Sequence, residues 1–181
     1  MNTCVCAVAS ERSDRTMNNE EPDWVATAHA DTQAVYRYWN RKRGTRLMPA
    51  RADIDPAELV RHLPTIMLVD VRPGRSVTGG PVYVYRLVGT AEVAVRGQDP
   101  TGHPVETHGF GLTLLDAVRN YDQVVESRAP WFDGFETLLT DQDIRDGESM
   151  FLPLSANGQD VDMILVFSVQ EKLVVGAAPE S

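Results

Sequence analysis

Residues 161–169 read Val-Asp-Met-Ile-Leu-Val-Phe-Ser-Val, and this stretch decides the fold more than any other part of the chain. Its apolar side chains occupy both alternations of an extended strand. One alternation holds Met163, Leu165, Phe167 and Val169, and the other holds Ile164 and Val166. A strand that is apolar on both faces needs cover on both faces. The segment therefore predicts a strand at the centre of a sheet that has helices or another layer on each side.

Four further segments are predicted strands, because they are rich in β-branched and aromatic residues and are bounded by turn residues. They are residues 65–71, 82–88, 131–140 and 149–154. The first is apolar on both alternations, so we expect it beside residues 161–169 at the centre of the sheet. The pair Asn157-Gly158 predicts a tight hairpin between the last two strands.

Two long amphipathic helices are predicted from apolar residues that recur every three or four positions. The first covers residues 23–44 and is defined by Val25, Ala28, Thr32, Val35 and Trp39, with Trp24, Tyr36 and Tyr38 beside them. The second covers residues 110–126 and is defined by Leu112, Leu115, Val118, Tyr121 and Val125. Shorter helices are predicted after the N-cap Asp55, ending by Pro64, and over residues 90–96.

This order of elements predicts an α+β fold in which all five strands form one antiparallel sheet and the helical middle crosses one face. The first helix must then cover the other face of a sheet, either in its own chain or in a neighbour. We expect a homodimer in which Val35, Tyr36 and Trp39 of that helix form the interface. The alternative is that the helix folds back over its own sheet.

Length, composition and charge restrict the class of protein. The chain has 181 residues, which fits one domain with short appendages. Its formal net charge of -9 disfavours binding to nucleic acid or anionic lipid, and its apolar runs are too short to span a membrane. No basic residue precedes the short apolar stretch at residues 5–9, so a secretory signal is not expected. Without a secretory signal or a membrane span, we expect a cytoplasmic location. Cys4 and Cys6 do not suit a disulfide framework or a zinc site.

Composition along the chain predicts four regions. Residues 1–22 are expected to form a flexible leader, because they are polar and lack an apolar period. The amphipathic helix occupies residues 23–44, the main domain residues 45–172, and a C-terminal tail residues 173–181.

Several stretches, taken in order, resemble the PAS superfamily, and more closely a family of small bacterial PAS proteins found mainly in alphaproteobacteria. They are Asp53-Ile-Asp-Pro-Ala-Glu-Leu59, Leu63-Pro-Thr-Ile-Met-Leu-Val-Asp-Val71, Tyr85-Arg-Leu-Val-Gly-Thr90, Gly97-Gln-Asp-Pro-Thr-Gly102 and Phe151-Leu-Pro-Leu-Ser-Ala-Asn-Gly158. The resemblance covers about residues 35 to 170, and the order of the stretches carries it rather than any one motif.

The resemblance implies a five-stranded sheet in the spatial order 2-1-5-4-3, with helices over one face that enclose a small pocket. It also implies a sensory or protein-interaction role without catalysis. We expect a stand-alone module of bacterial signal transduction that acts through a partner protein, because 181 residues leave no room for a kinase or cyclase.

Catalytic and cofactor chemistry finds little support in the sequence. His29, His62, His103 and His108 form no pair at metal-ligand spacing, and no cysteine follows residue 6 to form a flavin adduct. We therefore expect no metal, haem, flavin or other cofactor. One alternative is a small cone-shaped α+β isomerase or hydrolase in which His103 or His108 meets an aspartate in the cavity. Another is a dimeric scaffold without a pocket.

A ligand, if the protein binds one, is expected to be small and largely apolar. The residues predicted to contact it are Arg86, Leu87, Leu115, Trp131, Met163, Leu165 and Phe167. Arg86 lies in an otherwise apolar strand, where it would either orient an acidic ligand or pair with Asp70 of the neighbouring strand. We favour the pair with Asp70, because a buried charge usually has a protein counterion.

Overall fold

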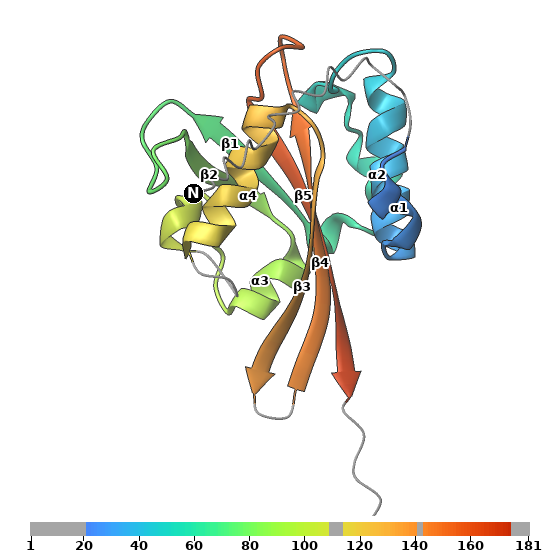
Figure 1. The fold of residues 1–181 in the computed structure, drawn as a ribbon, viewed down its shortest axis with the longest axis vertical. Coiled ribbons are helices and arrows are strands. Elements are labelled where there is room, and N and C mark those ends of the chain that lie inside the picture. Colours follow the sequence, from blue (N-terminus) through green and yellow to red (C-terminus); the bar gives the residue numbers. More distant parts are fainter. Residues whose placement is uncertain (1–20, 109–113, 141–142, 175–181) are drawn as a thin grey trace, which may run out of the picture.

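The structure, a computed structural model, describes residues 21–108, 114–140 and 143–174 (Figure 1). The helices are α1 (Asp23–Thr27), α2 (Ala30–Arg43), α3 (Thr90–Arg96) and α4 (Leu114–Ser127). Short 3₁₀ helices are η1 (Arg51–Asp53), η2 (Pro56–Leu59), η3 (Leu63–Thr65) and η4 (Val105–Thr107). The strands are β1 (Ile66–Arg72), β2 (Val82–Val88), β3 (Trp131–Thr140), β4 (Asp143–Leu154) and β5 (Met163–Val174). Residues 1–20 of the predicted leader (1–22) and residues 175–181 of the predicted tail (173–181) lie outside the described residues.

The strands form one antiparallel sheet in the order β2-β1-β5-β4-β3, as expected. The prediction that β1 and β5 are adjacent in the middle is confirmed, because Ile66 is opposite Phe167 and Val69 is opposite Ile164. β4 and β5 start or end several residues beyond the predicted limits. These extensions pair with each other from Asp143 opposite Val174 onward, and the three strands β3–β5 reach past the helices (Figure 1).

Helices cover both faces of the sheet, α1 and α2 on one and α4 on the other (Figure 1). We call the first the α2 face and assign Phe132 to it, because the ring of Trp24 in α1 stacks on Phe132 with centroids 4.8 Å apart. The second is the α4 face, to which Phe151 belongs, because Tyr121 of α4 meets its ring edge-on at 5.1 Å. The doubly apolar central strand is thus covered twice, which explains its composition.

The predicted helix over residues 23–44 is two helices in the structure, so that prediction is wrong at its middle. His29 adopts an extended backbone and caps α2, with its ring nitrogen accepting a hydrogen bond from the N–H of Asp31. The carboxylate of Glu148 on β4 accepts two further bonds, from the backbone N–H of His29 and from the hydroxyl of Thr32. A strand residue far along the chain therefore holds the start of α2, which local periodicity does not reveal.

The segment between α2 and the sheet is made of 3₁₀ turns. Asp55 caps η2 through its side chain, as predicted, by accepting from the N–H of Ala57. Pro64 does not stop one helix but lies inside the separate turn η3, where it takes an early position that needs no N–H. His62, at the N-cap position of η3, is buried, and its ring meets Phe167 edge-on.

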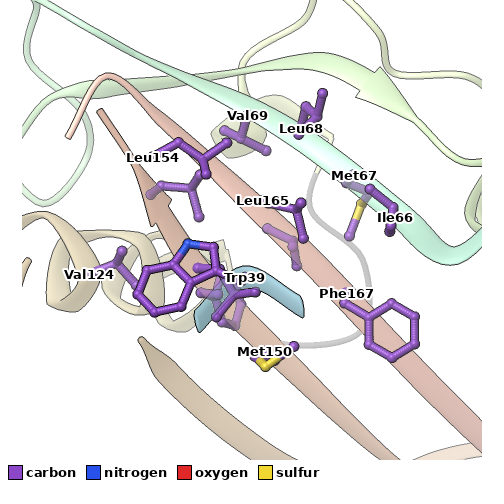
Figure 2. Packing of buried hydrophobic residues seen from close by; sticks show 14 of the residues in the cluster. Trp39, Ile66, Met67, Leu68, Val69, Val124, Met150, Leu154, Leu165 and Phe167 are labelled. Carbon is purple, nitrogen blue, oxygen red and sulfur yellow. The ribbon is translucent and has the colours of Figure 1, made fainter. Parts of the chain in front are cut away.

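One hydrophobic core joins the N-terminal helices to the sheet. Trp39 and Val35 of α2 belong to the same buried cluster as Met150 and Leu165 of the sheet. In Figure 2 the indole of Trp39 lies over the sheet in the region of these strand residues. Among the described residues, no helix is long and apolar enough to cross a membrane.

Candidate functional site

The residues predicted to line a ligand pocket do not come together, and this prediction is corrected. Leu165 and Phe167 are buried on the α2 face, because Phe167 is opposite Met150 and Met150 is opposite Phe132. Met163 follows the same alternation and is half-buried. They pack beneath the N-terminal helices. The sequence pattern shows that both alternations of β5 are apolar, but it does not say which one faces which helix.

Three other predicted pocket residues are largely at the surface. Leu87 is 45% exposed, Leu115 is 40% exposed and Trp131 is 38% exposed. Trp131 lies on the α4 face, opposite Phe151, with its indole nitrogen bonded to the side chain of Asn120. These side chains mark the edges of the fold rather than its interior.

Arg86 is exposed and makes no pair with Asp70, so the favoured ion pair is wrong. The register between β1 and β2 shifts after Leu68, which is opposite Leu87, while Val69 is opposite Tyr85. Arg86 is the extra residue of this β-bulge, and a bulge changes which side chains point inward. The carboxylate of Asp70 pairs instead with Arg72 at 2.8 Å.

The residues predicted to form a dimer interface are covered within the chain. Val35 is 0%, Tyr36 4% and Trp39 2% exposed. Tyr36 contacts Trp24, and Trp39 donates from Nε1 to the carbonyl of Pro153. The helix folds back over its own sheet, so these three side chains are not available to a second copy, although dimerisation itself stays a prediction.

The histidines needed for the alternative enzyme lie beside each other, and neither forms a hydrogen bond or ion pair with an aspartate among the described residues. The rings of His103 and His108 are 4.6 Å apart between centroids, and the Nδ1 of His108 shares a hydrogen bond with the hydroxyl of Thr107. The imidazole of His29 has its Nδ1 3.7 Å from the carboxylate of Asp31, and His62 has its Nε2 3.1 Å from the same carboxylate. The contact of His62 joins η3 to α2 on the other face.

A cluster of buried polar side chains lies on the α4 face, where sequence reasoning placed none. It consists of Tyr85 on β2, Glu92 and Arg96 on α3, and Tyr121 on α4. Glu92 is 5% and Tyr121 4% exposed, and the side chain of Arg96 is 11% exposed. An acidic and a basic side chain that are both buried in a core are uncommon. This cluster is therefore a candidate functional site.

Two glycines hold α3 in the position that buries this pair. A Cβ on Gly89, the N-cap, would come within 2.3 Å of the carbonyl oxygen of Pro64, so only glycine fits against η3. Gly97 ends the helix with a positive φ of 74°. Glu92 and Arg96, four residues apart, then share the face of α3 that is turned to the core.

The guanidinium of Arg96 connects four elements. One nitrogen, Nη1, donates to the hydroxyl of Tyr85 at 3.3 Å and to the carbonyl of His108 at 3.2 Å. Nη2 lies 3.5 Å from the sulfur of Met67 on β1, and Nε lies 3.7 Å from the carboxylate of Glu92. These contacts are longer than the 2.8 Å of the exposed pair Arg72–Asp70. The Glu92–Arg96 pair is therefore more widely spaced than the pair between Arg72 and Asp70.

Burial controls the ionisation of the cluster. Loss of hydration raises the pKa of Glu92, and the neighbouring guanidinium of Arg96 only partly opposes this. Burial also raises the pKa of Tyr85 and holds that of Tyr121 well above its ordinary value. Both phenols therefore stay neutral near pH 7, and the carboxyl group of Glu92 is the member of the cluster most easily switched by protonation.

A local signal for this site was present in the sequence but is not specific. Tyr83 and Tyr85 alternate in a predicted strand, and Glu92 and Arg96 are four apart in the next predicted helix. The same spacing is common on exposed helices, where it gives a solvated ion pair. In the described part of the chain, no three histidine, cysteine or acidic side chains are grouped in a way that suits a metal ion.

A family model described as PAS domain matches residues 27–167, and the chain belongs to this family. The match runs from the last residue of α1 into the first part of β5 and includes the polar cluster. PAS domains are typically sensory modules without catalytic activity, which agrees with the role that the sequence implied.

Solved structures with a similar fold are PAS domains and related sensory proteins. The PAS domain of BvgS from Bordetella pertussis is 18% identical, covers 65% of this chain and 86% of its own, and gives a TM-score of 0.38. A sensor histidine kinase from Vibrio cholerae is 16% identical, covers 64% and 88%, and gives 0.42. A LOV protein from Rhodobacter sphaeroides is 11% identical, covers 68% and 71%, and gives 0.40. These likenesses are too distant to support conclusions about ligands, and no curated protein matches the chain.

Proposed function

We propose that this chain is a sensory module that binds a small molecule on the α4 face and passes the signal to a partner protein. The buried pair Glu92–Arg96 is the observation that carries the proposal. A buried ion pair adds little to stability unless its geometry is excellent, and this pair is 3.7 Å apart. Arg96 also links β1, β2 and η4, and a binding role adds a reason why charge is kept in this buried place.

The surroundings of the pair suit a small, largely apolar ligand with few polar anchors. Buried apolar residues on this face come from both central strands and from α4. They are Met67, Val69, Val118, Tyr121, Ile164 and Val166. This moves the expected ligand contacts from Leu165 and Phe167 to the opposite alternation of β5.

Arg96, in the same cluster, is the residue that we expect to pass the signal from the site toward a partner. Arg96 touches β1 through Met67, β2 through Tyr85 and the end of η4 through His108. A ligand that engages the guanidinium would change several of these contacts together. The signal would leave the module as a small shift of the sheet and of the helices packed on it, without a catalytic step.

The cellular side of the proposal follows from charge and surface. We place the protein in the cytoplasm, where it acts on a signalling protein. It does not bind nucleic acid or membrane in this proposal, since the net charge is -9. A homodimer is part of the proposal as well. With the stripe of α2 covered, its interface would need other apolar groups, and Val60, Val77 and Leu87 are exposed.

Native mass spectrometry of freshly purified full-length protein tests the sensory proposal. We expect added mass that denaturing conditions release as a small organic molecule, and we expect it to be reduced in Arg96→Lys. Arg72→Lys, at an exposed pair, is the matched control and should keep the added mass. A wild-type protein that carries no added mass, and whose Tm is unmoved by mixtures of cell metabolites, would favour the scaffold without a pocket.

A further inference from the structure

We propose that the Glu92–Arg96 pair anchors an organic ligand that carries a single carboxylate group, and that Glu92 takes up a proton as this ligand binds. The inference rests on the proposed sensory function and adds to it the chemical class of the ligand and a coupling to pH. It follows from the donors, charges and aromatic rings that surround the pair.

The donors around the site favour a carboxylate. A planar guanidinium presents paired N–H groups that match the two oxygens of a carboxylate, and such bonds are usually about 2.7–2.9 Å long. The contacts of Arg96 to Tyr85, His108 and Met67 are 3.2–3.5 Å long. A ligand carboxylate could therefore replace long contacts to a phenol and a thioether with shorter and stronger ones.

Charge balance separates a carboxylate from a phosphate. The guanidinium of Arg96 brings one positive charge to a place where Glu92 is 5% exposed. A phosphate would bring nearly two negative charges into this low-dielectric region, and each charge buried there without a partner carries a desolvation penalty. A single carboxylate brings one negative charge, and protonation of Glu92 removes one, so the net charge of the site stays the same.

Glu92 is placed to become neutral. The groups that face it are Arg96 on its own helix, Tyr85 on β2 and Tyr121 on α4, and neither phenol brings a positive charge. η3, which packs against α3, contributes Leu63, Pro64 and Thr65, none of which titrates. When the ligand binds the guanidinium, the cation that faces Glu92 is engaged elsewhere. The proton then comes from solvent, and the neutral acid can donate it to the ligand or to a neighbouring oxygen.

The rings beside the pair favour a ligand with an apolar, preferably aromatic, body. Tyr85 lies under the guanidinium at 5.4 Å from its ring centroid, and Tyr121 stacks on Tyr83 at 5.1 Å. Benzoate and its neutral analogue benzamide are therefore suitable probes, because they share a ring and differ in charge.

The experiment is isothermal titration calorimetry of the full-length protein with benzoate and with benzamide, in two buffers of different ionisation enthalpy at the same pH. We expect benzoate to bind with net proton uptake and benzamide to bind at least tenfold more weakly. Above the pKa of Glu92 in the free protein, benzoate affinity should rise by up to about tenfold for each unit that the pH falls.

Variants separate the two parts of the inference. Glu92→Gln, close in shape to the protonated acid, should bind benzoate without proton uptake and with a flat pH profile. Arg96→Lys should weaken benzoate at least tenfold, while Arg72→Lys should not change it. Circular dichroism and Tm show whether each variant is folded, and Glu92→Gln alone decides the question if Arg96→Lys is not.

Other results overturn the inference without deciding the sensory function. Equal binding of benzamide and benzoate, or benzoate binding that is unchanged in Glu92→Gln including its proton uptake, would show that the site does not select a carboxylate in this way. Failure of both probes to bind up to roughly 10 mM would reject the carboxylate anchor. A neutral molecule found on the native protein by mass spectrometry would leave the sensory proposal standing and remove this one.

Discussion

The indole Nε1–H of Trp39 donates a hydrogen bond to the carbonyl oxygen of Pro153, 2.9 Å away. The donor is on α2 and the acceptor is near the end of β4, so the bond closes the N-terminal helix onto the sheet of the same chain. Trp39 is 2% exposed, and this contact therefore contributes to the core of the monomer.

Replacing Trp39 by Ala should lower the free energy of unfolding by about 3–5 kcal/mol, because it removes a large buried side chain and leaves the carbonyl of Pro153 without its donor. Urea denaturation measures the change, and Arg41→Ala on the exposed side of α2 is the control. Light scattering should give the same molecular mass for the folded variant and the wild type. A variant that keeps the wild-type free energy of unfolding but no longer dimerises would instead support a dimer interface on α2.

Gly89→Ala should destabilise the fold strongly, by roughly 3 kcal/mol, because the new Cβ would press on the backbone of η3 and displace α3. Gly134→Ala is the matched control, since its Cβ would meet only the ring of Phe132 at 3.8 Å. The control should change stability by about 0.5 kcal/mol or less. Equal effects in the two variants would contradict the close approach of α3 to η3.

Asp31→Asn should remove part of the acid sensitivity of the fold. The hydrogen bond from His62 lowers the pKa of Asp31 below its ordinary value of 3.8. An acid whose pKa is lowered by folding adds stability above the unfolded pKa, and this stability is lost as the pH falls through the folded pKa. Asp31 is 42% exposed, so solvent screening limits the effect to at most about 1 kcal/mol.

Denaturation curves for the Asp31 variant between pH 7 and pH 3 test this. The difference from wild type should be largest at pH 7 and should shrink toward pH 3. The carboxylate of Asp160 is 4.0 Å from Arg128 and 74% exposed. The free energy of unfolding of Asp160→Asn should therefore have the same pH dependence as that of wild type. A difference for Asp31→Asn that stays constant over this range would mean that His62 does not hold the carboxylate.

Glu92→Gln should have the opposite dependence on pH. Burial raises the pKa of Glu92 above its ordinary value of 4.5, so the folded protein holds this proton more tightly than the unfolded chain. Its ionisation therefore costs stability as the pH rises from the unfolded pKa to the folded one, and the cost is constant above that.

The neutral amide of Glu92→Gln removes this term. We expect wild type to lose stability relative to the variant as the pH rises above 4.5, with the difference levelling once Glu92 is ionised in the folded protein. Parallel urea denaturation of both proteins from pH 4 to pH 8 measures it. A variant that is less stable than wild type by the same amount at every pH would show that the carboxyl group does not titrate abnormally.

The sequence by itself determined the elements and their order. Residues 82–88, 90–96 and 131–140 are predicted and observed with the same limits, because turn residues and glycines bound them. The apolar residues on both alternations of β1 and β5 also place both strands in the middle of the sheet, since a strand that is apolar on both sides must be covered on both. These are local properties of the chain.

Only the tertiary structure decided which residues meet. A strand that is apolar on both alternations does not indicate which one faces α4, so Leu165 was assigned to the wrong face. The bulge at Arg86 and the break at His29 depend on partners far along the chain, as does the choice of α2 to cover its own sheet. Glu92 and Arg96 have a spacing that suits a solvated helix equally well, and their burial follows from the contact of Gly89 with η3. Periodicity reports local geometry, whereas burial of a given side chain is set by the long-range contacts that the folded chain makes.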